Sequence, residues 1–102
     1  MDNVLYHCGP GFEVESFTNI HVAQAIRQIS IGHKKVLAIN TEIYYHNDGT
    51  SRVIVTLYIE GKVIDLWVKD SDSWIPGKEA KLFARECFDK FKSEIAALTL
   101  ND

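Results

Sequence analysis

The chain has 102 residues, of which 46% are apolar and 25% are charged, and its formal net charge is −3. This size and composition predict one globular domain and exclude a disordered chain. The mild acidity gives no general attraction to nucleic acid or to anionic membranes. No apolar run reaches the length of a membrane span, and no basic segment followed by an apolar one opens the chain, so we expect a cytoplasmic protein. Cys8 and Cys87 fit free thiols in a reducing compartment better than a disulfide framework.

Residues 1–17 are predicted to form an N-terminal arm. Apolar runs at 4–7 and 12–15 flank a Gly-Pro-Gly break at residues 9–11. They predict either a hairpin of two short strands or an extended arm laid across a sheet. The large apolar side chains of the arm indicate that it packs on another part of the molecule.

Residues 18–31 are predicted to form a helix, which opens a single domain at 18–98. Thr18 or Ser16 would cap its first turn, and Gly32 would end it. Apolar and small side chains fall on one face of this helix at helical spacing. They are Val22, Ala23, Ile26, Ile29 and Ser30.

Residues 36–68 predict a meander of three antiparallel strands. At its first turn, Asn47-Asp48-Gly49 predicts a three-residue loop with the glycine in the left-handed conformation. This loop places His46 opposite Thr50 and sets the register of the two strands. The register pairs Ile43 with Val53, Thr41 with Val55, Ile39 with Leu57 and Leu37 with Ile59.

The second turn of the meander is predicted at Glu60-Gly61, as a two-residue loop that glycine permits. This turn pairs Leu57 with Ile64 across the second hairpin. Every cross-strand pair is then apolar on both sides, so a slip of one residue would destroy the match. The other pairs are Val55 with Leu66 and Val53 with Val68.

A second helix is predicted at residues 77–98, followed by a tail at 99–102. Its apolar stripe has only the apolar sheet face and the first helix to pack against. The predicted fold is therefore an α+β two-layer sandwich, a three-stranded meander with two helices on one face. The stripe is made of Ala80, Phe83, Ala84, Cys87, Phe88, Phe91, Ile95 and Leu98.

The order of helix, three antiparallel strands and helix over residues 18–98 resembles the double-stranded RNA-binding domain. In that family a Lys-Lys-x-Ala-Lys cluster at the start of the second helix grips phosphates across a major groove. Here Gly77-Lys78-Glu79-Ala80-Lys81 stands at that place, with Gly77 where the family has a lysine. The resemblance implies duplex-RNA contacts by Lys78 and Lys81, and by His46 in the loop that would enter a minor groove.

The face of the predicted sheet that points away from both helices combines aromatic, apolar and charged groups. An exposed patch of this kind marks a partner surface, and Trp, Tyr and Arg dominate the binding energy of interfaces. Alternatively, Phe12, Val14 and Phe17 of the arm fold over this face and make it a second small core. The candidate partner-binding residues are Tyr44, His46, Arg52, Ile54, Tyr58 and Trp67.

These observations favour a non-enzymatic protein-binding module, an adaptor or inhibitor of the kind that phages or accessory elements encode. It would dock on another protein or on a second copy of itself, as a homodimer. The alternative is an RNA-binding domain that uses the basic flank of the second helix, Lys78, Lys81 and Arg85. The sequence contains no metal-ligand spacing, nucleophile signature or phosphate-binding glycine loop, so we expect no cofactor, metal or catalytic residue.

Overall fold

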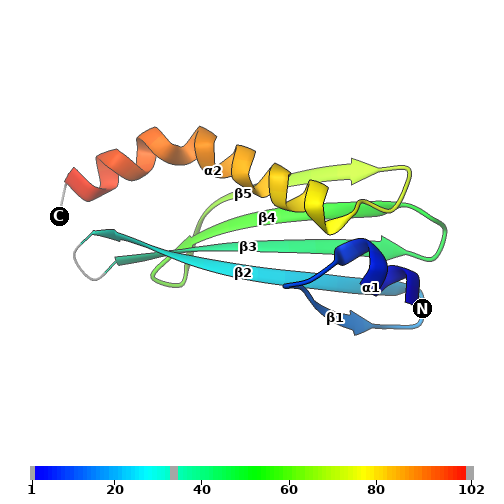
Figure 1. The fold of residues 1–102 in the computed structure, drawn as a ribbon. Helices are drawn as coiled ribbons and strands as arrows, with labels where there is room; N and C mark the ends of the chain where they lie inside the picture. The colour runs from blue at the N-terminus through cyan, green and yellow to red at the C-terminus, as the bar shows by residue number, and fades with distance from the viewer. Residues whose placement is uncertain (1, 33–34, 101–102) are drawn as a thin grey trace.

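The computed structural model describes the backbone of residues 2–32 and 35–100, and the side chains of residues 4–32 and 35–92. Five strands form one antiparallel sheet in the order β1-β2-β3-β4-β5, so strands adjacent in the chain are adjacent in the sheet. A short N-terminal helix and a long C-terminal helix complete the fold (Figure 1). The elements are α1 (Asp2–Cys8), β1 (Glu13–Ser16), β2 (Ile20–Gly32), β3 (Lys35–His46), β4 (Ser51–Ile59), β5 (Lys62–Ser71) and α2 (Gly77–Leu100).

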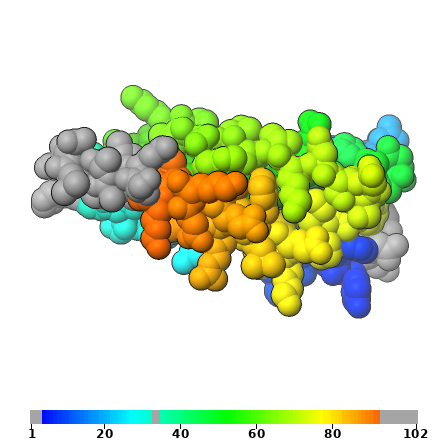
Figure 2. Space-filling model, turned by 90° about the horizontal axis from the view of Figure 1, so that it is seen from above, coloured from blue at the N-terminus to red at the C-terminus, as the bar shows by residue number. Residues whose placement is uncertain are grey.

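The sheet has two unlike faces. Its helix face is covered by α1 and α2, whereas no described helix or strand packs on its other face, which we call the open face. Seen from above, α2 runs along much of the elongated molecule, which measures 46 × 21 × 20 Å (Figure 2). The predicted three-stranded meander is therefore wrong, because the sheet has five strands, although the protein is α+β.

The predicted helix at residues 18–31 is also wrong, because this run belongs almost entirely to β2. Five of the 13 residues of β2 are Ile or Val, whose branched side chains fit a pleated surface. The strand pairs with β1 on one side and with β3 along its whole length on the other. Pairing on both sides stabilises the strand by more than the helix propensity of its Ala, Gln and Arg residues would stabilise a helix.

The β3–β4 hairpin confirms the predicted first turn. The amide of His46 donates to the carbonyl of Thr50 at 2.9 Å. Gly49 takes the left-handed conformation with φ of 93°. All four predicted pairs are present, from Ile43 opposite Val53 to Leu37 opposite Ile59. Local turn chemistry thus sets the register of the two central strands.

The β4–β5 hairpin has the predicted turn but a different register. Glu60 and Gly61 both have positive φ, and Ile59 pairs with Lys62. The register then shifts beyond Tyr58, so the predicted pairs are wrong. The observed partners are Asp65 for Leu57, Trp67 for Val55 and Lys69 for Val53.

The register shift is a β-bulge at Ile64, and it has a packing reason. Ile64 and Trp67 both pack against the core, although residues three apart in a regular strand point to opposite faces. One extra residue in β5 brings both side chains to the helix face. The free energy gained by burying Trp67 on the helix face exceeds the cost of leaving Leu66 and Val68 half exposed on the open face.

The core lies between α2 and the central strands. Its fully buried members on the strands include Leu37, Ile43, Tyr45, Val53, Val55 and Leu57. The helix at Gly77–Leu100 confirms the predicted C-terminal helix, and Ala80, Cys87 and Phe91 of its predicted stripe are buried. Of the predicted tail at 99–102, residues 101–102 lie outside the described residues.

The N-terminal arm differs from both expectations. Residues 4–7 belong to α1 rather than to a strand, whereas Glu13–Ser16 forms the edge strand β1. The arm packs on the helix face, where Val4 and Cys8 are buried, and Val14 pairs with Ala23 on that same side. It therefore leaves the open face uncovered.

Candidate functional site

The open face carries apolar side chains over β4 and β5, and Asn40 and Thr56 separate them from Ile26 on β2. The register places them side by side, with Tyr58 beside Val63, Ile54 beside Val68, and Thr56 beside Leu66. The exposed fractions reach 62% for Ile26, 58% for Val63 and 50% for Leu66. An exposed apolar group of this extent is typical of an interaction surface. We define the apolar patch as Ile26, Val36, Ile54, Tyr58, Val63, Leu66 and Val68.

The candidate partner-binding residues do not all lie on one face. Five of them, Tyr44, His46, Arg52, Ile54 and Tyr58, lie on the open face as predicted. The sixth, Trp67, lies opposite Val55 on the helix face and packs against the core. Trp67 changes face because of the bulge in β5, and no local sequence signal predicts that bulge.

The half of the open face near the β3–β4 turn is polar. Arg52 forms two hydrogen bonds with the carboxylate of Asp70, at 2.6 and 3.2 Å. The Arg52 guanidinium holds the pKa of Asp70 below its usual range. Tyr44 donates its hydroxyl to Glu42 at 3.0 Å, and burial together with this hydrogen bond raises the pKa of Tyr44. The polar groups next to the apolar patch are therefore hydrogen-bonded to one another.

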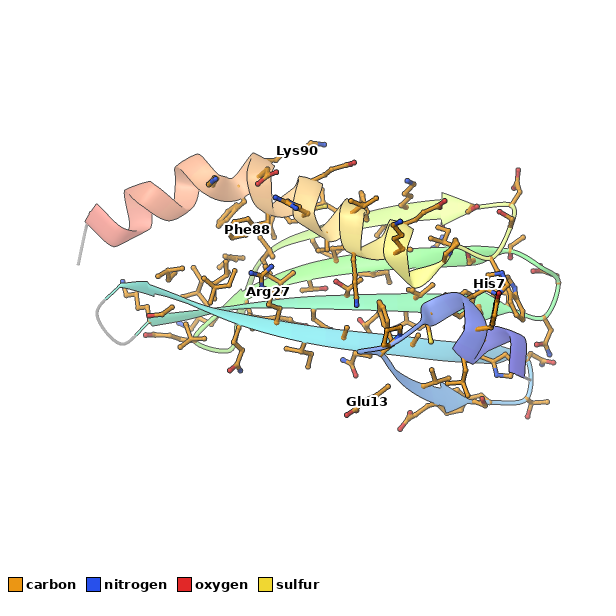
Figure 3. All side chains as sticks on the ribbon, viewed as in Figure 1. His7, Glu13, Arg27, Phe88 and Lys90 are labelled. Carbon is orange, nitrogen blue, oxygen red and sulfur yellow. The ribbon has the colours of Figure 1, made fainter. Side chains whose placement is uncertain are left out.

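A cleft of about 670 Å³ separates α2 from β2 on the helix face. Arg27 of β2 and Phe88 of α2 point toward one another across it (Figure 3). Two of the three predicted nucleic-acid-binding residues, Lys81 and Arg85, line this cleft, whereas the exposed Lys78 does not. Its other lining residues include Ala25, Ile29, Ile39, Thr41, Ala84, Asp89 and Lys92.

Arg27 is the lining residue that the sequence analysis missed. The predicted helix placed it away from the core, where a charged side chain needs no explanation. In β2 it instead lies opposite Ile39, on the same side as Ala25 and Ile29. If residues 21–29 are interpreted as a strand, alternation places Arg27 on the same face as Ala25 and Ile29, so a cation on the helix face could have been predicted.

An aromatic cluster fills the end of the helix face near α1. Tyr45 donates its hydroxyl to the carbonyl of Ile75 at 2.6 Å, and its ring lies 5.3 Å from the ring of Trp74. His21 Nδ1 lies 2.8 Å from the hydroxyl of Ser16, and its ring is edge-on to Trp74. A serine nucleophile requires an orienting group for the histidine and oxyanion donors in addition. In this cluster His21 thus contacts both Ser16 and the ring of Trp74.

The two thiols are expected to be unreactive in the folded protein. Cys8 and Cys87 are 2% and 1% exposed. Burial raises the pKa of both, and it raises that of Cys87 to about 11. Because the thiolate is the nucleophile, iodoacetamide should modify neither thiol appreciably near neutral pH but should modify both in urea. Mass spectrometry counts the adducts, and rapid labelling of either cysteine without urea would contradict the structure.

Comparison with family models, with curated proteins and with solved structures finds no match for this chain. Within residues 2–32 and 35–100, no helix is both long and apolar enough to cross a membrane. Residues 4–32 and 35–92, whose side chains the structure describes, contain no group of His, Cys, Asp and Glu side chains that could hold a metal ion.

Proposed function

We propose that this protein is a non-enzymatic protein-binding module that docks a second copy of itself through the open face. The observation that supports this proposal is the uncovered apolar patch, four members of which, Ile26, Val63, Leu66 and Val68, are about half exposed or more. Leaving such a group in water costs free energy that burial in an interface recovers. In a two-fold dimer the same patch of each copy meets its equivalent, which suits a surface rich in uncharged side chains.

The size of the open face is sufficient for a dimer. Its five strands contain 48 residues in all; at about 4.8 Å between strands and about 3.3 Å per residue, they cover roughly 760 Å². This matches the area of about 800 Å² that each partner contributes to a standard interface. The polar pairs beside the patch would form the rim, and the patch itself the dry centre.

Face-to-face packing is favoured over pairing of sheet edges. The edge strand β5 contains the bulge at Ile64 and alternates charge through Lys62, Asp65 and Lys69. Bulges and charged side chains are the features by which sheet proteins prevent edge-to-edge association. The exposed face, which lacks such protection over the apolar patch, is therefore the surface that associates.

The test replaces one residue at the centre of the patch. Leu66→Asp should weaken the dimer at least about 100-fold, because an unpaired carboxylate in the interface costs several kcal/mol. Sedimentation equilibrium of the wild type and of this variant measures the change. The monomer itself should remain folded, since Leu66 is 50% exposed there, and circular dichroism checks this point.

Leu82→Asp is the matched control, because Leu82 is 53% exposed on α2 and lies outside the patch. It should leave the dimer unchanged. A wild type that is monomeric at high concentration, or a Leu66→Asp variant that still dimerises, would contradict the proposal. A monomeric wild type would direct the search to a different protein as the partner of the open face.

The cytoplasm is the compartment we propose, with two free buried thiols as support.

A further inference from the structure

The geometry points to a second site: the cleft between α2 and β2 binds a single-chain anionic amphiphile, such as a long-chain carboxylate. The cleft lies on the helix face and shares only Ile26 with the apolar patch, so the inference does not depend on the proposed dimer. Its volume of about 670 Å³ falls within the range of about 300–1,000 Å³ that small-molecule sites occupy.

The first observation is that cations from two elements converge on this cleft. Lys81, Arg85 and Lys92 of α2 line it from one side. With Phe88 they follow one stripe of the helix at spacings of three and four residues, so these charges face β2. Arg27 enters from the opposite wall, on the face of β2 that otherwise meets the core.

The second observation is that the described carboxylates do not neutralise these cations. Asp89 is the one acid among the lining residues, and within residues 4–32 and 35–92 no salt bridge joins a carboxylate to Arg27, Arg85 or Lys92. Lys81 is held instead by the carbonyl of Pro10 at 3.1 Å, with its ammonium over the ring of Phe12. In a chain with net charge −3, local positive charge of this kind attracts an anion. Like charges on both walls repel one another, so an anion between them would stabilise the fold.

The third observation is the apolar floor, which selects the class of anion. Ala25, Ile29, Ile39, Ala84 and Phe88 line the cleft beneath the cations. A free phosphate or a nucleic-acid backbone would leave these side chains in water. A hydrocarbon chain covers them while its head group reaches Arg27, Arg85 or Lys92, in the pattern of many apolar sites with a few fixed polar groups.

Calorimetric titration with dodecanoate, below the concentration at which it forms micelles, tests the proposal. We expect one ligand per chain and a rise in the midpoint of thermal unfolding. Each further methylene in a series from octanoate to dodecanoate should tighten binding by up to about fourfold. Dodecyl phosphate, which has the same chain, tests whether the site distinguishes a carboxylate from a phosphate head; binding of either supports the anionic amphiphile.

Arg27→Gln removes one cation from an exposed position and should weaken dodecanoate binding at least about tenfold. Lys78→Gln, on the same helix as Arg85 but outside the cleft, should leave it unchanged. The Leu66→Asp variant should bind as the wild type does, which separates this inference from the proposed dimer.

Four results would overturn the inference. They are binding of neither dodecanoate nor dodecyl phosphate, equal binding of acetate, equal binding of dodecyltrimethylammonium, and salt-dependent binding of duplex RNA that Lys81→Gln and Arg85→Gln weaken while dodecanoate fails to compete. Equal binding of acetate would show a site for the head group alone, and equal binding of the cationic amphiphile would show a site for the chain alone. The RNA result would assign the cations to phosphate contacts.

Discussion

Leu57→Ala is expected to lower the free energy of unfolding by about 2–5 kcal/mol, as a large-to-small change in a packed core does. Leu57 is fully buried at the centre of β4, opposite Ile39 on one side and Asp65 on the other. It lies on the helix face, so the substitution leaves a cavity beneath α2 as well as removing transfer free energy. Urea unfolding followed by circular dichroism measures the loss.

Leu82→Ala provides the matched control, because it removes the same atoms from a leucine that is 53% exposed on α2. Its effect should stay within about 0.5 kcal/mol, as for most surface substitutions. Equal urea midpoints for the two variants would mean that Leu57 does not face the helix layer, and the register of β3 with β4 would then be wrong.

Gly77→Ala is expected to destabilise the protein by about 1–3 kcal/mol or more, as overpacking of a tight contact does. A methyl group on Gly77 would collide with the backbone carbonyl of Cys8 and would lie 2.8 Å from the ring of Phe12. Because the obstacle is backbone, side-chain rotation cannot relieve it. Either α1 or the start of α2 must move, and α1 is the shorter element.

The displacement of α1 can be detected independently of stability. Cys8 is 2% exposed in the native fold, so it should become accessible to iodoacetamide in Gly77→Ala while Cys87 stays protected. Lys78→Ala, at the next position of the same helix turn, should change neither labelling nor the thermal midpoint by much. A Gly77→Ala variant with native stability and a protected Cys8 would show that the contact between α1 and α2 is absent in solution.

Several elements could be predicted from the sequence because their signals are local. The apolar stripe of α2 repeats at helical spacing over many turns, and it gave the helix to within two residues at its end. The loop Asn47-Asp48-Gly49 fixed its own conformation, and through it the pairing of Ile43 with Val53. The turn at Glu60-Gly61 was likewise set by a glycine that tolerates positive φ.

The open face was predicted in part. Alternation along β3 and β4 placed Tyr44, Arg52, Ile54 and Tyr58 on it. Its exposure could not be predicted, because the arm could equally have covered it. Only the packing of Val4 on the helix face decided that the arm lies elsewhere.

Tertiary structure alone decided the rest. Residues 18–31 carry both a helical and an alternating pattern, and pairing with β1 and β3 selected the strand. The bulge at Ile64 moved Trp67 from the open face to the helix face, because two large side chains three residues apart could be buried together only with an extra residue between them. The same strand pairing turned Arg27 toward α2 and made a basic cleft with Lys81, Arg85 and Lys92, which follow Arg27 by 54 or more residues in the chain. The local sequence determines the turns and the spacing of apolar residues. Where one segment fits both a helix and a strand, the outcome depends on which neighbouring element its apolar side chains can pack against.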